Sequence, residues 1–295
     1  QRLTGEKIKV QNIEYIYCNK CDHLNGIYQD TERFIETIYK TKSINYSKNY
    51  FESEKKNYLK RVKNIYKPKA EFLKSNIKNY NKLNILDFGA GSGYFLAALK
   101  EVKINNFLGL EISNDQVSYG KNMLKKIHIS TEKLKCLSFE NSLKLINKSN
   151  NFNCITLMGV LEHISQLSKF MKTLKNNKKI KIIYLVVPLF SLTAVIESVF
   201  PKIFNRHLGG SHTHLFTENS LKYLFKKNGF HPHSEWWFGQ DFNDLARSLE
   251  VTSKKFKNIA SEKVISQIQN LIDDFQIVLD KKKLSSEVHI IFSRK

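Results

Sequence analysis

The sequence is poor in the residues and segments that mark several classes of protein. Its 295 residues include only four cysteines, and their spacing does not repeat, which argues against a disulfide-built scaffold. Together with the lack of a signal-like start, this scarcity predicts a reducing compartment, the cytoplasm. The longest apolar segment, residues 182–200, contains Pro188 and Glu197, so we expect a buried strand, a loop and a short helix there rather than a membrane span.

Arginine is also scarce. The 48 basic residues outnumber the 27 acidic ones and give a net charge of +21, which by itself suggests a nucleic-acid or anionic-membrane partner. Only six of the basic residues are arginines, however, and the lysines are spread along the whole chain. Proteins that read nucleic acids rely on the bidentate guanidinium group, so we interpret the lysines as a solvated surface and expect no nucleic-acid partner.

The residues that are present favour a folded α/β protein. Hydrophobic residues make up 41% of the chain and aromatic residues 12%, enough for one large core. From about residue 81, short apolar runs such as "NILDFG" and "FLGLEI" alternate with segments of helical spacing such as "GYFLAALKEV" and "NDQVSYGKNMLKK". This alternation is typical of a mostly parallel sheet with helices on both faces.

The same patterns divide the chain into four parts. Residues 1–29 look irregular and contain a Cys-x-x-Cys, and residues 30–80 have mostly helical spacing. Residues 81–239 plus 285–295 carry the alternating strands and helices and form the predicted core. Residues 240–284 look helical, so we expect a helical insertion before the last strand.

Three of the 12 glycines stand in one short stretch, "ILDFGAGSGYF", at the end of the first strand of this core. Gly89, Gly91 and Gly93 let the backbone turn sharply and approach a ligand, at the edge of the sheet where ligands bind. Asp87 precedes the loop, where it would repel a pyrophosphate and attract a cation, and Glu111 ends the next strand, where it can accept hydrogen bonds from ribose hydroxyls. The pattern favours S-adenosylmethionine over a dinucleotide.

These residues resemble the class I S-adenosylmethionine-dependent methyltransferases, as do "GLEIS", "ITLMGVLEHI" and "HTHLFTENSLKYLFKKNGF". The resemblance covers roughly residues 80–240 and implies a Rossmann-like, doubly wound, mostly parallel seven-stranded sheet. It implies S-adenosyl-L-methionine as methyl donor and S-adenosyl-L-homocysteine as product. It assigns to the methionine end of the cofactor Asp87, Gly89, Ala90, Gly91, Gly93 and Tyr94. It assigns Glu111 and Ile112 to the ribose, and Phe139 and Glu140 to the adenine. Met158, Gly159 and Val160 would form the floor of the site.

The Cys-x-x-Cys near the start narrows the resemblance. Cys18 and Cys21, with His23 nearby, are half of a tetrahedral zinc site, which needs four ligands. A zinc-ribbon-like start ahead of this core resembles bacterial sugar methyltransferases, which act on nucleotide-linked sugars. The alternative is a pair of reduced cysteines in a turn, without structural zinc.

Transfer to a hydroxyl group needs a base, and three histidines are candidates: His163 in "VLEHI", and His212 and His214 in "GGSHTHLF". The last two would face one side if the segment is extended, and they could instead bind a metal ion, whereas His163 could simply orient a loop or contact the cofactor. Arg206 and His207, just before them, are candidates for a sugar-nucleotide phosphate.

The sequence therefore predicts a methyltransferase that modifies a hydroxyl of a nucleotide-linked sugar, for example a deoxysugar or a heptose. Such reactions belong to the biosynthesis of capsules, other surface polysaccharides and natural products. The alternatives are a quinone or lipid-precursor methyltransferase, a sugar C-methyltransferase and an RNA-binding methyltransferase. A homodimer is compatible with the sequence, which does not specify the oligomeric state.

Overall fold

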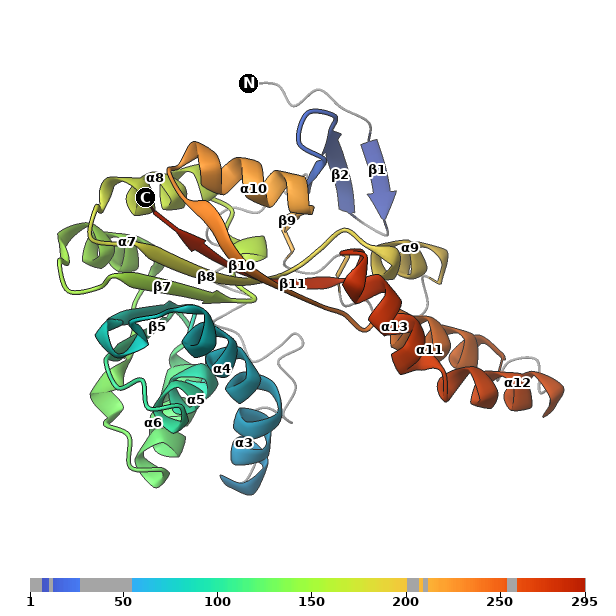
Figure 1. The fold of residues 1–295 in the computed structure, drawn as a ribbon, viewed down its shortest axis with the longest axis horizontal. Coiled ribbons are helices and arrows are strands. Elements are labelled where there is room, and N and C mark those ends of the chain that lie inside the picture. Colours follow the sequence, from blue (N-terminus) through green and yellow to red (C-terminus); the bar gives the residue numbers. More distant parts are fainter. Residues whose placement is uncertain are drawn as a thin grey trace.

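The computed structural model describes residues 7–10, 13–26, 55–200, 207–208, 212–253 and 259–294. A seven-stranded sheet in the order β10-β11-β8-β7-β4-β5-β6 forms its centre (Figure 1). The strands are β4 (Ile85–Phe88), β5 (Phe107–Glu111), β6 (Leu134–Cys136), β7 (Cys154–Met158), β8 (Ile182–Pro188), β10 (His231–Phe238) and β11 (Glu287–Ser293). Pairing is parallel from β8 through β6, and β11 runs antiparallel to both β8 and β10, so the predicted Rossmann-like sheet is confirmed.

The central strands form where the sequence has apolar runs with many β-branched residues. All four residues of β4 are buried, and so are the five central residues of β8. A parallel strand covered on both faces has this continuous apolar character, because neither side reaches water. The apolar run of residues 182–200 is thus β8 followed by helix α9 (Leu192–Val199), and no helix in the described part of the chain is both long and apolar enough to cross a membrane.

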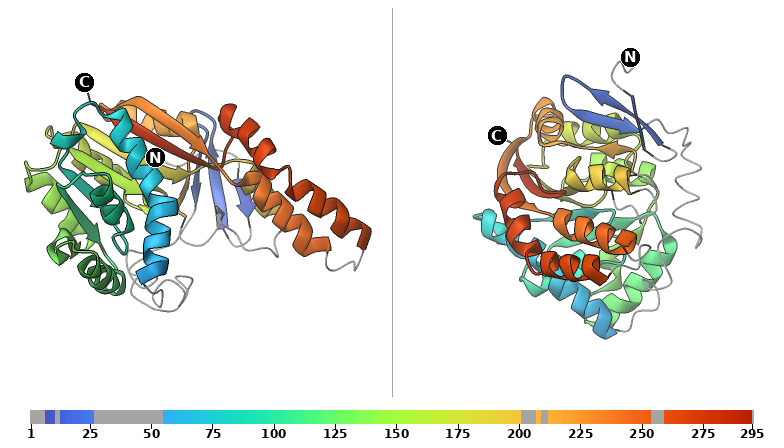
Figure 2. Two further views of the ribbon diagram at one scale, coloured as in Figure 1. Left: turned by 60° about the horizontal axis from the view of Figure 1, so that its bottom comes forward. Right: turned by 90° about the vertical axis from the view of Figure 1, so that its right-hand side faces the viewer.

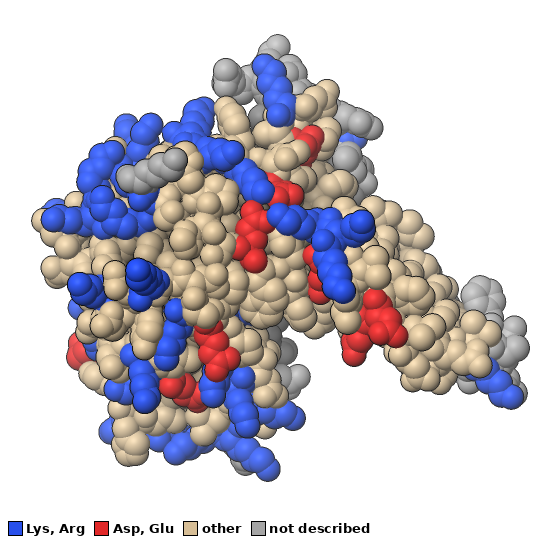
Figure 3. Space-filling model, viewed as in Figure 1, with Lys and Arg blue, Asp and Glu red and all other residues tan. Residues whose placement is uncertain are grey.

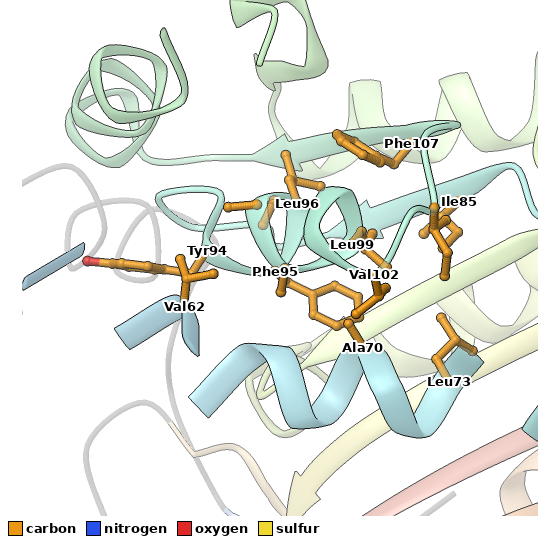
Figure 4. Packing of buried hydrophobic residues seen from close by; sticks show 14 of the residues in the cluster. Val62, Ala70, Leu73, Ile85, Tyr94, Phe95, Leu96, Leu99, Val102 and Phe107 are labelled. Carbon is orange, nitrogen blue, oxygen red and sulfur yellow. The ribbon is translucent and has the colours of Figure 1, made fainter. Parts of the chain in front are cut away.

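Helices cover the sheet in two layers. One layer contains α3 (Lys55–Arg61), η1 (Val62–Tyr66), α4 (Lys67–Asn76), α5 (Tyr94–Glu101) and α6 (Asn114–Lys126); the other contains α7 (Phe139–Lys148), α8 (Leu167–Asn176) and α10 (Glu218–Lys227). Figure 4 shows the first layer, in which Ala70 and Leu73 of α4 pack toward Phe95, Leu99 and Val102. This packing holds α4 against α5, the helix that follows the glycine loop (residues 89–93).

Short 3-10 turns complete the connections between these elements: η2 (Tyr80–Lys82), η3 (Thr131–Lys133) and η4 (Leu161–His163). The last of them follows β7 directly, where the sequence predicted that the strand runs into a helix.

A second, smaller sheet corrects the expectation that residues 1–29 are irregular. The strands β1 (Lys7–Val10), β2 (Ile13–Cys18) and β3 (His23–Gly26) form an antiparallel meander, and β3 also pairs with β9 (His214–Leu215). Tyr15, Leu24 and Leu215 are buried in a small apolar cluster between them. The meander was missed because its outer partner comes from about 190 residues further along the chain.

The C-terminal helices form an arm that projects beyond the end of the sheet (Figures 1 and 2). They are α11 (Asp241–Ser253), α12 (Ile259–Gln269) and α13 (Ile272–Lys281). Asp241 anchors the arm, since its buried carboxylate accepts hydrogen bonds from Thr193 and from the backbone N–H of Ser286. Figure 3 shows lysine and arginine side chains scattered over the sheet-bearing part and few on the arm.

Candidate active site

A cavity of about 470 Å³ opens at the carboxyl ends of β4, β5 and β7. This is the edge at which open parallel sheets bind their ligands. Twelve of the thirteen residues that the sequence assigned to the cofactor line the cavity, and Gly93 is the exception because it lies behind the loop at the start of α5. The glycine stretch and the end of the second core strand thus meet at one place.

The glycine loop is bent tightly over the sheet. Gly89 has a φ of +75°, in the left-handed region that side chains disfavour, and a Cβ there would lie 2.6 Å from Cγ2 of Val160. The N–H groups of Gly89 and Ala90 both donate to the carbonyl of Leu110, at 2.8 and 2.9 Å. The loop is therefore tied to β5, and glycine is required where it passes the cavity wall.

Glu111 is held by backbone groups on both sides. Its Oε2 accepts a hydrogen bond from the N–H of Gly91 at 2.8 Å, and its Oε1 accepts from the N–H groups of Ile112 and Ser113 at 2.8 and 2.9 Å. Burial raises the pKa of the Glu111 carboxyl, and these three donors oppose that rise. A carboxylate has about four acceptor positions, so one position on Oε2 is left for a ligand hydroxyl in the cavity.

Asp87 is a buried acid beneath the loop. Its Oδ1 accepts a hydrogen bond from the hydroxyl of Thr156 at 2.6 Å, and only 1% of the residue is exposed. Burial raises the pKa of Asp87 to about 7, against the effect of Thr156 and with a further contribution from the Glu111 charge. A cationic ligand near this carboxyl would stabilise its ionised form.

Aromatic and cationic groups from the segment before the core close the cavity on another side. Arg61 and Tyr66 line it together with Tyr94, and the guanidinium carbon of Arg61 lies 5.2 Å from the centre of the Tyr94 ring. The rings of Tyr66 and Tyr94 are stacked at 5.4 Å. Arg61 and Tyr66 were not predicted from the sequence, because nothing in the helical spacing of residues 30–80 indicates which face meets the glycine loop.

The wall formed after β6 and β7 is mostly apolar. Phe139 begins α7 and contacts Phe88 edge to face, with ring centroids 6.1 Å apart. Glu140 lines the cavity beside it but forms an ion pair with Lys169. Met158 lines the cavity from the carboxyl end of β7. This wall of the cavity can therefore pack against a flat apolar ring of a ligand.

The side chains that line the cavity match S-adenosylmethionine in charge, hydrogen-bonding capacity and polarity. Asp87 matches its ammonium and sulfonium charges, and the Arg61 guanidinium matches its carboxylate. Glu111 has an acceptor position for a ribose hydroxyl, and Phe139 offers an apolar face for adenine. Each group lines the same cavity, so the fit rests on one continuous surface.

Three side chains meet at one side of this cavity. His163 lines it, and its Nε2 lies 3.8 Å from Oε1 of Glu162, while its ring centroid lies 4.8 Å from that of His212. Burial raises the pKa of Glu162 to about 7 and lowers the pKa of His212. Thr213 holds the two segments together, because its N–H and its hydroxyl both donate to the Glu162 carbonyl at 2.9 and 3.0 Å.

His214 lies in a different environment from His212, although the sequence suggested that the two face one side. Its Nε2 bonds the Ile164 carbonyl at 3.1 Å, which requires Nε2 to donate, and its Nδ1 lies 3.1 Å from Nε2 of His23. Burial lowers the pKa of His214 to about 4 and that of His23 to about 3. His214 does not line the cavity, so it joins β9 to β3 rather than reaching an acceptor.

The remaining candidates lie away from the cavity or outside the described residues. Arg206 is among the residues that the structure does not describe. His207 is buried, and its Nδ1 donates to the Leu189 carbonyl at 3.3 Å, so this nitrogen is not turned to a phosphate. Cys18 ends β2, Cys21 lies in the turn after it, and both are free thiols; within the described ranges no third metal-binding side chain accompanies them. Zinc at these cysteines stays a prediction.

Comparisons with known proteins agree with this geometry. The family model described as "Methyltransferase domain" matches residues 54–235, more than half of the chain. A search of curated proteins finds no significant match.

Two solved structures illustrate the shared fold. Geranyl diphosphate C-methyltransferase from Streptomyces coelicolor A3(2) is 13% identical, with a TM-score of 0.50 over 86% of this chain and 86% of that one. Magnesium protoporphyrin IX methyltransferase from Synechocystis PCC 6803 is 12% identical, with a TM-score of 0.50 over 84% of this chain and 97% of that one. At these identities the likeness concerns the fold alone. The family match, which spans the strands and loops that build the cavity, shows that the chain belongs to the methyltransferase-domain family and is an S-adenosylmethionine-dependent methyltransferase.

Proposed function

We propose that this methyltransferase modifies a hydroxyl oxygen of a small molecule, a nucleotide-linked sugar. The observation that carries the proposal is the cluster of Glu162, His163 and His212 beside the cofactor cavity, which we call the histidine cluster. A hydroxyl is a poor nucleophile until it loses its proton, and a positioned histidine contributes roughly 10²- to 10⁴-fold to such a reaction. An acceptor hydroxyl that enters beside His163 would meet this cluster.

The chain's own residues supply binding and orientation. When bound, S-adenosylmethionine supplies a methyl group on a positively charged sulfur, which leaves as a neutral thioether. Glu111 orients the ribose, Asp87 and Arg61 hold the charged methionine end, and Val160 limits the space beside the glycine loop. Alignment of donor and acceptor at about 3 to 3.5 Å supplies much of the acceleration.

The histidine cluster removes the acceptor proton. As the acceptor oxygen forms its bond to the methyl carbon, the carbon–sulfur bond breaks and its electron pair stays on sulfur. The hydroxyl proton passes to the side of the cavity where His163 and Glu162 lie, and the raised pKa of Glu162, about 7, suits a group that exchanges protons near neutral pH.

The sugar class rests on the sequence resemblance, because the Cys-x-x-Cys start resembles sugar methyltransferases. One further feature argues against a nucleic-acid base as the acceptor. The turn after β7 reads "MGVLEH". It lacks the Asn/Asp-Pro-Pro-aromatic sequence that is typical of enzymes that methylate the amino groups of bases.

A competition among acceptor classes tests the proposal. The purified protein would be incubated with methyl-labelled S-adenosylmethionine and, separately, with sugar nucleotides, quinols, lipid precursors and RNA. We expect label in one or more sugar nucleotides, at an oxygen identified by mass spectrometry and NMR. Label only in a quinol, in a lipid precursor, at a sugar carbon or in RNA would overturn the assignment of the acceptor.

A further inference from the structure

The histidine cluster has the composition of a metal site. One ligand atom from each of Glu162, His163 and His212 lies within 4.8 Å of the other two. Ligands bound at about 2.1 Å from an ion lie about 3.0 to 3.5 Å apart, so closure requires a shift of roughly an ångström or a side-chain rotation. Two imidazoles and one carboxylate are a common ligand set for divalent first-row metals with open coordination positions.

One oxygen of the cluster's buried carboxylate lacks a hydrogen-bond partner in the part of the chain that the structure describes. Oε2 of Glu162 is buried and has no hydrogen-bond partner among the described residues, and the residue is only 3% exposed. Lys69 is the nearby cation, but it forms an ion pair with Glu287 at 3.5 Å. A buried carboxylate oxygen without a hydrogen bond is costly, and a bound cation would stabilise it.

The second histidine is oriented as metal-binding histidines are. The Nδ1 of His212 donates to the His207 carbonyl at 2.6 Å, because a carbonyl can only accept, and this places the lone pair on Nε2. The carbonyl is itself fixed, since the N–H groups of His207 and Leu208 donate to the buried carboxylate of Glu197 at 2.9 and 2.7 Å. Such a supporting layer fixes the tautomer and the direction of a ligand.

The cluster borders the cavity through His163. His163 lines the cavity, together with Gly159, Val160 and Ile164, which offer no metal-binding side chain. A Cβ on Gly159 would lie 3.5 Å from Oε1 of Glu162, so this small residue lies next to the carboxylate. A coordination position left vacant beside His163 would therefore face an acceptor in the cavity.

We infer that Glu162, His163 and His212 bind one divalent first-row metal ion, which takes the acceptor hydroxyl as a further ligand. This inference rests on the proposed function for the identity of the acceptor. The ion lowers the pKa of the hydroxyl that it binds. With the ion bound, Glu162, His163 and His212 are its ligands and do not take up the proton themselves. The hydroxyl proton passes to water in place of the histidine cluster, the oxygen bonds the methyl carbon, and the carbon–sulfur bond breaks with its electrons on sulfur.

Cobalt(II) is the probe for this site, because its visible absorption reports the coordination of the ion. The protein would carry Cys18→Ser and Cys21→Ser, so that thiolates do not compete, and would be stripped with a chelator before titration. We expect one Co²⁺ per chain by calorimetry, with visible bands of a nitrogen–oxygen site. Glu162→Gln, His163→Gln and His212→Gln should each weaken this binding at least tenfold.

Two controls separate specific binding from other effects. His128→Gln removes an exposed histidine outside the cluster and should leave Co²⁺ affinity unchanged. S-adenosylmethionine affinity measured on each cluster variant shows that it is folded, and at least one of the three variants is required to keep it.

Three results would overturn the inference. They are the absence of stoichiometric Co²⁺ or Zn²⁺ binding, equal affinity in a folded cluster variant, and full turnover of the stripped protein in excess chelator. The last result, combined with lost turnover in His163→Gln, would leave the proposed function standing with an imidazole as base. Methyl transfer to none of the sugar nucleotides, with stoichiometric Co²⁺ bound to the histidine cluster, would instead remove the acceptor assignment and retain the metal site.

Discussion

The two ends of the cavity are built in opposite ways. At the cofactor end, Asp87 and Glu111 lie on neighbouring parallel strands, and backbone N–H groups of the glycine loop and of the turn after β5 hold Glu111 in place. At the end where we propose that the acceptor binds, called the acceptor end, Glu162 and His163 come from the turn after β7, and His212 comes from a segment about 50 residues later. The acids and the glycine loop of the cofactor end are a local product of consecutive βα units, whereas the acceptor end exists only when distant segments meet.

This difference also separates what the two ends can do. Glu111 has most of its acceptor positions filled by the backbone, so it is a rigid binding group. Glu162 has an oxygen without a hydrogen-bond partner in the described part of the chain, and it lies beside two imidazoles. We therefore expect substitutions at the cofactor end to change affinity and substitutions at the acceptor end to change turnover.

The largest effect is expected at the acceptor end. His163→Ala and His212→Ala should each lower kcat for the accepted sugar nucleotide by roughly 10²-fold or more, because both remove a group of the histidine cluster. The affinity for S-adenosylmethionine, measured by calorimetry, should stay within a few-fold of the parent value. Full turnover in both variants would show that the acceptor end contributes position alone.

A substitution at the cofactor end should reverse this pattern. Glu111→Ala should weaken S-adenosylmethionine binding by on the order of 1.5 to 3 kcal/mol, the scale of hydrogen bonds to a charged group. Glu132→Ala, at an exposed acid of the η3 turn, is the matched control and should bind normally. Equal calorimetric affinities for the two variants would remove Glu111 from the ribose site.

A substitution of His214 tests whether this histidine has a structural role, in contrast to the role in turnover proposed for His212. His214→Ala removes hydrogen bonds to His23 and to Ile164, so the free energy of unfolding in urea should fall by about 1 to 2 kcal/mol. Turnover per folded molecule should remain within a few-fold of the parent. A loss of kcat as large as that of His212→Ala would place both histidines in the reaction.

The pH dependence of cofactor binding should reflect the acid beneath the glycine loop. The pKa of Asp87 is about 7 without a ligand, and a bound cation favours the ionised carboxyl. Affinity should therefore fall as the pH falls, by at most about tenfold between pH 8 and pH 6. Asp87→Asn should bind more weakly at pH 8 and lose this slope, whereas an unchanged slope would assign the titration to another group.

The elements that the sequence predicted well are those whose signals are local. The strands β4, β5, β7 and β8 are apolar runs bounded by turn residues, and the glycine loop is recognisable because three glycines lie within five residues. In a parallel sheet the strand ends meet at one edge whatever the rest of the chain does. This is why most of the residues assigned to the cofactor line one cavity.

The errors occur where a partner comes from far along the chain. Residues 1–29 were expected to be irregular, because β3 needs β9 as its neighbour. Arg61 was overlooked because only the packing of α3 and α4 on the core brings it to the cavity. His212 and His214 were expected on one side. The segment becomes a strand only at His214, so the alternation of an extended chain does not relate the two rings.

Periodicity and turn chemistry act over a few residues, so the parallel sheet, the glycine loop and the acids at the ends of its strands could be predicted from the sequence alone. Only the tertiary structure decided that His212 joins Glu162 and His163 while His214 joins His23. That choice depends on the contacts of Thr213 with Glu162 and of β9 with β3. Such contacts form across distances in the chain that no local pattern encodes, so the acceptor end of the site becomes visible only in the folded molecule.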